Sequence, residues 1–455
     1  MLLQSEKLST LTTWLCGVLF VASIIFHSSA SKAQQAASAP VIITLDDAIH
    51  RAQANEPAFA ASVADNKVAA LDRSIARAAL LPNAVYHNQV LYTQPNGESN
   101  QAGQGVGSQP SPRFIANNAV REYASQAQIT ETIGVAQVAE VKRADAASAF
   151  AAAQLEVARR GLVVTVVNLY YGLLAADQKL AVATRAAGEA DAFVDLTQKR
   201  ESAREVAHAD VIKAQLEQQQ RQRDLSDATV VAEKARLELA VLLFPDPRAP
   251  YDLEKGFAVK DVPTREAIEA AASANNPDVK SALAALQQSN TEVLAARAAY
   301  LPDLALNFNY GIDAPQFAVN GPDGVRNLGY SAAVTLDIPV WDWLSTQHRV
   351  KQSEIRRDAT RVALSAAQKR LVAELDEFYS EAMAAHSQIG SLDASVQTAA
   401  ESLRLTKLRY TGGEATVLEV VDAQNALTLA ENARADGRIR YELALANLQT
   451  LTGTL

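Results

Sequence analysis

Two long stretches of the chain repeat apolar residues in alternating steps of four and three, and no proline interrupts either stretch. In the second half the pattern comprises Leu371, Leu375, Phe378, Ala382, Ala385, Ile389, Leu392, Val396, Ala399 and Leu403. In the first half it comprises Leu162, Val166, Leu169, Leu173, Ala176, Leu180, Ala183, Ala187, Ala190 and Val194. A sustained 3.5-residue period indicates left-handed coiled-coil packing. A helix from about residue 343 to 410 would reach roughly 100 Å at 1.5 Å per residue, far beyond the size of a compact domain.

These two stretches belong to a unit that the chain contains twice. ARAALLPN at 76–83 matches ARAAYLPD at 296–303, and LTQKR at 196–200 matches LTKLR at 405–409. The offset between the copies is eleven positions larger at the first match than at the second. The first copy therefore carries an insertion of that length, which falls in the polar, Gly-rich segment 94–112. The predicted division is a first repeat at 34–244, a Pro-rich linker at 245–263 and a second repeat at 264–455.

Each copy has the same predicted order of elements. An initial helix is broken or bent by Pro57 or Pro277 and ends at a Leu-Pro pair, because proline and the residue before it disfavour helix. Two alternating segments, the long helix, a turn and a second helix (207–243 or 416–452) follow. Paired glycines suit the turn of the second copy, whereas Glu201 to Arg204 contain none, so the first turn is the weaker prediction.

The alternating segments have the period of β-strands. Residues 304–312 and 328–338 place an apolar side chain at every second position and small or polar ones between; 86–92 and 123–133 do so less regularly. About ten residues with this dyad period is the pattern of a membrane β-barrel strand. A soluble hairpin with one buried face would show the same alternation, so the pattern alone leaves both readings open.

The N-terminus and the composition restrict the compartment and the class of partner. Lys7, an apolar stretch at 11–26 and small residues near Ala33 predict a signal peptide at 1–33, which includes the single cysteine, Cys16. The formal net charge is -9, and the chain has no basic runs, which argues against nucleic acid as a partner. Much of the 49% hydrophobic content is alanine, while aromatic residues make up only 6%, as in long Ala-rich helices.

Sequence motifs of enzymes are missing from the chain. The six histidines are scattered without the H-E-x-x-H spacing of a zinc site, and no P-loop, G-x-S-x-G elbow or cysteine nucleophile is present. The sequence therefore predicts no catalytic residue, no metal and no cofactor, and a periplasmic hydrolase is disfavoured.

Four candidate membrane strands cannot close a barrel, since about eight are needed, and open edges cannot face lipid. Several chains must therefore share one barrel, and three would supply twelve strands. The features that carry a family resemblance are the Leu-Pro pairs (81–82, 301–302), IPVW at 338–341, RYTGGEATVLEVVD at 409–422 and the terminal LTG at 451–453. Through them the chain resembles the TolC-like outer-membrane efflux family over nearly the whole mature sequence. The predicted fold is mainly α with a membrane β-barrel part. In the homotrimer, a 12-stranded β-barrel would be continued by a long periplasmic α-helical coiled-coil barrel.

The resemblance implies a passive exit duct in the outer membrane that extends into the periplasm. It would serve an efflux or type I secretion system, with a periplasmic adaptor and an inner-membrane pump as partners and outer-membrane lipid around it. The cargo and the class of pump cannot be read from the sequence. A soluble periplasmic coiled-coil scaffold is the alternative function.

Acidic residues just past the Gly-Gly turn are the leading site. Glu419 and Asp422 are spaced i, i+3 and share a helix face. In a three-fold assembly they would form carboxylate rings, which attract cations at a constriction. The resemblance implies that acids at these two positions narrow the periplasmic entrance, with Asp210 as the equivalent in the first copy, where Lys213 replaces the second acid. The alternative is an exposed acidic helix start, which the helix dipole favours.

Two further sets of residues are candidates. The resemblance implies that the helix tips, 201–206 and 411–415, contact the adaptor. The alternative is that these segments are only turns between helices. The tip residues are Ser202, Ala203, Tyr410, Thr411, Gly412 and Gly413. Trp341 and Trp343 flank the junction of strand and helix, where they would mark the membrane interface or pack the junction.

Overall fold

The computed structural model describes residues 41–92, 121–254, 261–321 and 324–453. The chain forms two units: the smaller contains residues 41–42 and Pro250–Asp252 of this described part, and the larger contains Ile43–Ala249 and Leu253–Leu455. Strands β1 (Val41–Ile43) and β4 (Tyr251–Leu253) pair with each other, so the predicted linker contains a short strand. The predicted signal peptide and the Gly-rich segment 94–112 lie outside the described residues.

The initial helix of each copy is broken at its proline, as predicted. Helices α2 (Leu45–Asn55) and α6 (Arg265–Asn275) have 11 residues each, and α3 (Pro57–Ala78) and α7 (Pro277–Ala298) have 22 each. Each proline takes the first position of the second helix, where its missing N–H costs no hydrogen bond. The equal lengths in both copies support the internal duplication.

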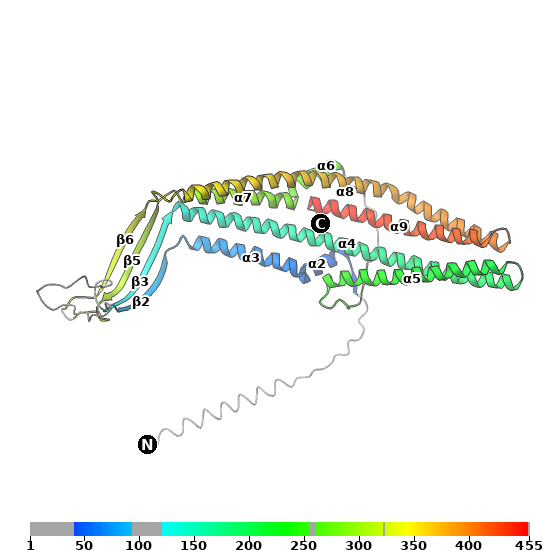
Figure 1. Ribbon diagram of the computed structural model, residues 1–455, viewed down its shortest axis with the longest axis horizontal. Coiled ribbons are helices and arrows are strands. Elements are labelled where there is room, and N and C mark those ends of the chain that lie inside the picture. Colours follow the sequence, from blue (N-terminus) through cyan, green and yellow to red (C-terminus); the bar gives the residue numbers. More distant parts are fainter. Residues whose placement is uncertain (1–40, 93–120, 255–260, 322–323, 454–455) are drawn as a thin grey trace, which may run out of the picture. The chain divides into compact units, whose positions relative to one another are not determined.

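The coiled-coil prediction is confirmed. Helix α4 (Val135–Ser202) has 68 residues and pairs with α5 (His208–Leu243); α8 (Ser345–Thr411) has 67 and pairs with α9 (Val417–Thr452). The heptad positions that are buried are Leu162, Val166, Leu173, Ala176, Ala187, Ala190, Val194, Leu375, Ala382, Ala385, Ile389, Val396 and Leu403. Helix α4 also contacts α7 and α9 of the second copy, so the two copies pack side by side (Figure 1).

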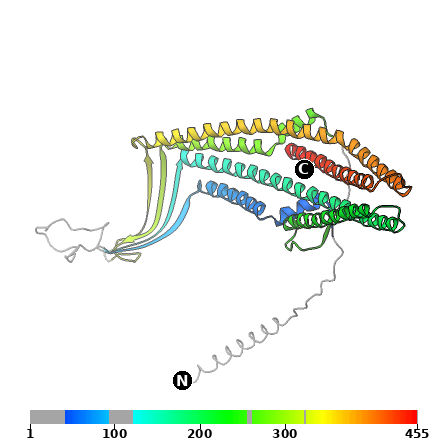
Figure 2. The ribbon, with the colours of Figure 1, turned by 45° about the vertical axis from the view of Figure 1, so that its right-hand side comes forward.

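All four predicted strands are present in one antiparallel sheet of order β2-β3-β5-β6. They span β2 (Asn83–Tyr92), β3 (Arg121–Gly134), β5 (Asp303–Ala314) and β6 (Leu328–Asp337). The central pair, β3 and β5, joins the two copies of the unit. Strands β3 and β6 precede α4 and α8 in the chain, whereas the α4–α5 and α8–α9 turns lie at the other ends of these helices (Figures 1 and 2).

The register of this sheet collects the predicted apolar positions on one face. Phe308 pairs with Ile129 on one side and Ala332 on the other, and directly paired residues share a face. The apolar face contains Tyr86, Val90, Tyr123, Ala127, Ile129, Ile133, Leu304, Leu306, Phe308, Tyr310, Ile312, Leu328, Tyr330, Val334 and Leu336. The opposite face contains Gln126, Gln128, Thr130, Thr132, Asn307, Asn309, Ser331 and Thr335. One surface of the sheet is therefore mainly apolar, and the other is mainly polar.

No α-helix in the described ranges combines the length and the apolar composition that crossing a membrane requires.

Candidate functional site: the tips of the helical hairpins

The α8–α9 turn has the geometry that its glycines predict. Gly413 adopts a left-handed conformation with φ +80°, which costs a glycine little. The N–H of Gly413 donates to the carbonyl of Tyr410, and the N–H of Glu414 donates to the carbonyl of Arg409. Thr411 and both glycines are exposed at this tip, as a contact with another protein would require.

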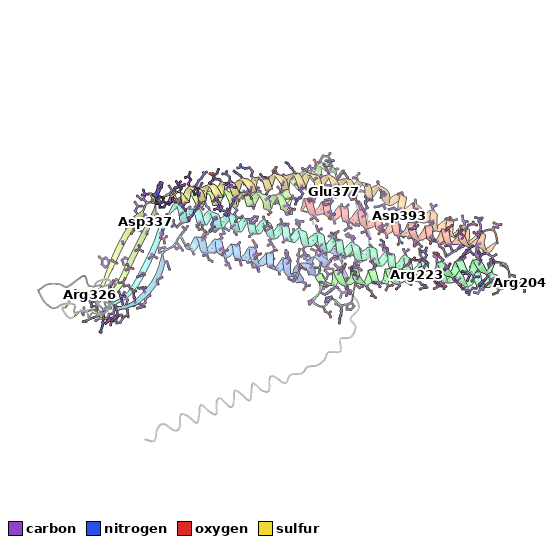
Figure 3. The ribbon with its side chains drawn as sticks, in the orientation of Figure 1. Arg204, Arg223, Arg326, Asp337, Glu377 and Asp393 are labelled. Atoms are coloured by element: carbon purple, nitrogen blue, oxygen red, sulfur yellow. The ribbon has the colours of Figure 1, made fainter. Side chains whose placement is uncertain are left out.

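The glycine-free α4–α5 turn has the same geometry. Arg204, labelled in Figure 3, adopts φ +62° at the position equivalent to Gly413. Its N–H donates to the carbonyl of Glu201, and the N–H of Glu205 donates to that of Arg200, which reproduces the two bonds of the second copy at the equivalent positions. A non-glycine residue here costs roughly 1–2 kcal/mol. Ser202 and Ala203 are exposed beside it.

Tyr410 differs from the expectation of a tip contact residue, because its side chain is buried. Its ring is 2% exposed and packs on Phe193 at 5.2 Å between ring centroids, with the Arg200 guanidinium over it at 4.7 Å. The hydroxyl donates to Thr197 Oγ1 at 3.3 Å, and Arg200 also donates to the Tyr410 carbonyl. Tyr410 therefore joins the two hairpins within one chain and offers little surface to a partner.

Sequence reasoning missed this junction, although the heptad pattern contained a signal for it. Tyr410 follows Leu403 by seven residues and so continues the apolar stripe of α8. Val417 and Val420 of α9 and Ala214 of α5 complete the apolar cluster around it. All four long helices thus meet at the tips.

Glu419 is part of a capping box at the start of α9. The Thr416 hydroxyl accepts from the Glu419 N–H at 3.3 Å, and Glu419 Oε1 accepts from the Thr416 N–H at 3.1 Å. Arg409 Nη1 lies 3.3 Å from the other carboxylate oxygen. The pKa of Glu419 is lowered, most strongly by the hydrogen bond from the Thr416 N–H and less strongly by the Thr416 hydroxyl and by Arg409. The carboxylate is thus charged at neutral pH, exposed, and also structural.

The remaining acids of the predicted site differ in their surroundings. Asp422 is exposed on the next turn of α9. Asp210 of the first copy is half-buried and lies 3.4 Å from Lys213, the residue that replaces the second acid. The second copy therefore presents two acids at its helix start, whereas the first presents an acid with a neighbouring cation.

Polar contacts connect the two copies above the tips. Lys407 lies 3.1 Å from Glu189, and Lys179 lies 2.7 Å from Asp436. Arg185 pairs with Glu431 in the same row. No sequence pattern predicted these ion pairs, because one partner of each pair belongs to the first copy and the other to the second.

The two tryptophans at the β6–α8 junction are exposed. Trp341 and Trp343 are 67% and 83% exposed and contact each other edge-to-face at 5.8 Å. They therefore do not fill a junction within the described chain. Asp342 between them caps α8, since its Oδ2 accepts from the Thr346 N–H at 2.7 Å. Residues 343 and 344 both have positive φ.

In the part of the chain that the structure describes, no cluster of His, Cys, Asp and Glu has the arrangement of a metal site.

Comparisons with known proteins show what the chain is similar to. A family model described as "Outer membrane efflux protein" matches residues 270–454. The CmeC outer membrane channel of Campylobacter jejuni has the same fold, with a TM-score of 0.78 and 17% identity over 90% of this chain and 85% of that chain. The chain thus resembles the outer-membrane efflux proteins, by sequence over its second repeat and by fold over most of its length.

Curated relatives agree with this resemblance. The chain is 27% identical to the outer membrane protein OprJ of Pseudomonas aeruginosa over 172 residues, 38% of this chain and 36% of OprJ. The match thus spans about a third of that relative's length. It is 23% identical to the alkaline protease secretion protein AprF of the same organism, over 90% of this chain and 84% of AprF. The comparisons support a protein of the cell outer membrane that extends into the periplasm.

Proposed function

We propose that the protein is a passive, homotrimeric exit duct of a tripartite efflux or type I secretion system. Substrates would reach it from a periplasmic adaptor and an inner-membrane pump, which supplies the energy, and would leave the cell through it. The observation that carries the proposal is the four-stranded sheet, which has one mainly apolar face and one mainly polar face.

The edges of this sheet support an assembly of several chains. Strands β2 and β6 each pair with a single neighbour among the described strands, so each leaves one row of backbone donors and acceptors open. In lipid such an edge costs several kcal/mol for every unpaired group, so spanning sheets close into barrels. Three four-stranded sheets supply twelve strands, with the apolar face toward lipid and the polar face toward the lumen.

The helical hairpins would continue the lumen of this barrel into the periplasm. Their tips would form the periplasmic mouth, where Glu419 and Asp422 recur three times around the axis. Both are exposed in the single chain, and Glu419 keeps its charge at neutral pH. Rings of carboxylates would favour cations there. We propose that the exposed tip residues contact the adaptor; these are Thr411, Gly412, Gly413, Ser202 and Ala203.

Cell fractionation tests the duct directly. The protein should sediment with outer membranes and should migrate as a trimer that dissociates only on heating. A monomer in the soluble periplasmic fraction would instead support the coiled-coil scaffold. Co-purification of an adaptor and a pump with wild-type protein would identify the system and, through the pump, the class of cargo.

The mouth is tested by conductance in planar bilayers. The Glu419→Gln/Asp422→Asn double variant removes both charges, and glutamine at 419 can still complete the capping box. Its pores should be less cation-selective and less sensitive to divalent block than wild type, with trimers intact. Glu401→Gln removes an exposed acid of α8 as a control. Unchanged reversal potentials in the double variant would remove the gate assignment and leave the duct untouched.

A further inference from the structure

One carboxylate interrupts the apolar face of the sheet. Glu131 in β3 pairs with Leu306 of β5, and Ile129 and Ile133 lie two residues to either side on the same face. Its Oε2 is shielded from solvent without a hydrogen-bond partner among the described residues. Burying an ionised group in apolar surroundings is costly unless a partner compensates its charge.

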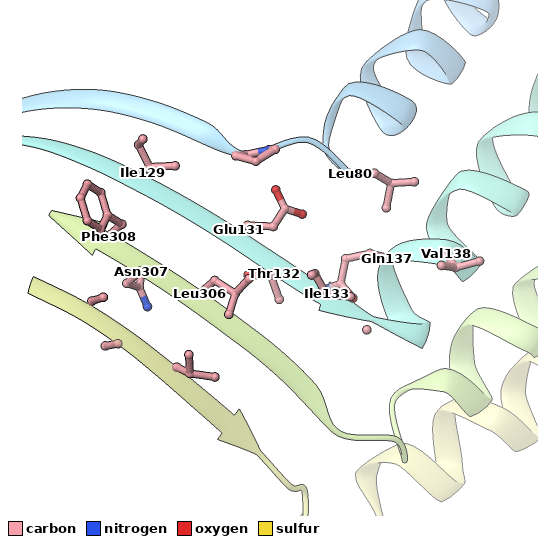
Figure 4. A pocket seen from close by; sticks show the side chains of 15 residues that line it. Leu80, Ile129, Glu131, Thr132, Ile133, Gln137, Val138, Leu306, Asn307 and Phe308 are labelled. Atoms are coloured by element: carbon pink, nitrogen blue, oxygen red, sulfur yellow. The ribbon is translucent and has the colours of Figure 1, made fainter.

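This carboxylate lines a cavity of about 730 Å³ where the sheet meets the end of α3 and the start of α4. Figure 4 shows Glu131 between Ile129 and Leu80. The walls are largely apolar and include Ile133, Val138, Leu306 and Phe308. Glu131 is the one titratable side chain among the described lining residues, and none of them is a lysine or arginine.

A second unsatisfied acceptor lies in the same wall. Gln137, in the first turn of α4, also lines the cavity, and its Oε1 is buried without a hydrogen-bond partner among the described residues. An occupant that supplies at least two N–H groups would satisfy both acceptors. A primary ammonium has three donors and a positive charge, whereas a quaternary ammonium has none.

The position along the strand favours one source of such an ammonium. Glu131 lies three residues before the end of β3, roughly 10 Å along the strand at about 3.3 Å per residue. In a membrane-spanning sheet this is near the boundary of the hydrocarbon layer, whose core is about 30 Å thick. Lipid headgroups lie at that depth, and acyl chains lie against the apolar residues further along the strand.

We propose that this cavity binds a phospholipid with a primary ammonium headgroup. The ammonium donates to Glu131 Oε2 and Gln137 Oε1, and an acyl chain covers Leu306 and Phe308. The assignment rests on the proposed membrane barrel, since only then does lipid reach this face.

Competition among lipids with identical acyl chains tests the site. Purified full-length protein is placed in nanodiscs of equimolar phosphatidylethanolamine, phosphatidylcholine and phosphatidylglycerol, and retained lipids are counted by native mass spectrometry. Wild type should retain the ethanolamine lipid over the choline lipid by about tenfold, the preference of a charge-assisted hydrogen bond. Glu131→Gln should abolish this preference. Glu140→Gln, which removes an α4 acid outside the cavity lining, should keep it.

A second variant separates the cavity from the charge. Ala332→Leu narrows the cavity from β6 and keeps Glu131, and it should reduce the number of retained ethanolamine lipids. Equal retention of all three lipids by wild type, or a preference that survives in Glu131→Gln, would overturn the lipid site while the duct stands. Protein that enters no membrane at all would instead overturn the duct.

Discussion

Truncation of Tyr410 should release the tips of the two hairpins from each other. The ring is almost fully buried among Phe193, Arg200 and Thr197. Replacing a buried aromatic side chain with alanine costs about 3–5 kcal/mol, which combines lost transfer energy and a cavity. Tyr410→Phe removes only the hydroxyl, whose bond to Thr197 is long at 3.3 Å. That loss should be near the lower end of about 0.5–1.5 kcal/mol.

Amide hydrogen exchange measures this difference locally, because protection factors report the free energy of opening. Tip amides at 197–206 and 407–420 should lose protection by about hundredfold or more in Tyr410→Ala, since each 1.4 kcal/mol is about tenfold. Tyr410→Phe should lose less than about tenfold. Leu429→Ala on α9 truncates a side chain that is 70% exposed and serves as the control.

Two results would refute this reasoning. Protection that is unchanged in Tyr410→Ala would mean that the tips are held by other contacts. Equal losses in the alanine and phenylalanine variants would mean that the hydroxyl, and not the buried ring, joins the hairpins.

Three further predictions concern the sheet and the helices. Phe308→Arg on the apolar face should cost ~2–4 kcal/mol near the bilayer midplane and reduce the heat-modifiable trimer on gels, whereas Asn307→Arg on the polar face should cost less; equal damage would contradict the orientation. Gly311→Ala should disrupt the sheet because its Cβ would lie 2.1 Å from a backbone oxygen of β3, whereas Gly329→Ala, with open space around it, should assemble normally in the same gel assay. The pKa of Glu156 is lowered to about 2, chiefly by its hydrogen bond from the arginine three residues on. A lowered carboxyl pKa stabilises the fold above the ordinary value of 4.5 and loses that effect as pH falls toward 2. The unfolding midpoints of wild type and Glu156→Gln should therefore differ at pH 7 and converge near pH 2.

Local patterns in the sequence predicted the elements well. The period of 3.5 residues, the prolines at 57 and 277 and the period of two each act over a few residues, so they fix the helices, the breaks and the strands without knowledge of distant contacts. The duplication added a second reading of each element. For the same reason the alternating segments proved to be strands in both copies, although the first copy alternates less regularly.

The tip turns show where local reasoning was insufficient. Glu201 to Arg204 contain no glycine, yet Arg204 adopts the left-handed conformation that Gly413 adopts easily. The four helices pack against one another there, and this packing offsets the strain at one residue. The family resemblance implied that Tyr410 contacts an adaptor, but Phe193 and Arg200, which belong to the other copy of the unit, bury it.

The sequence by itself determined which residues are apolar and at what period, and from this the kind of each element follows. Only the tertiary structure decided which elements share a surface. The β3–β5 register places Glu131 of the first copy opposite Leu306 of the second, so that one acidic residue of an alternating strand lies on an apolar face with its Oε2 shielded from solvent. Cross-strand register and helix docking depend on contacts summed over the whole fold, and no local window of sequence contains them.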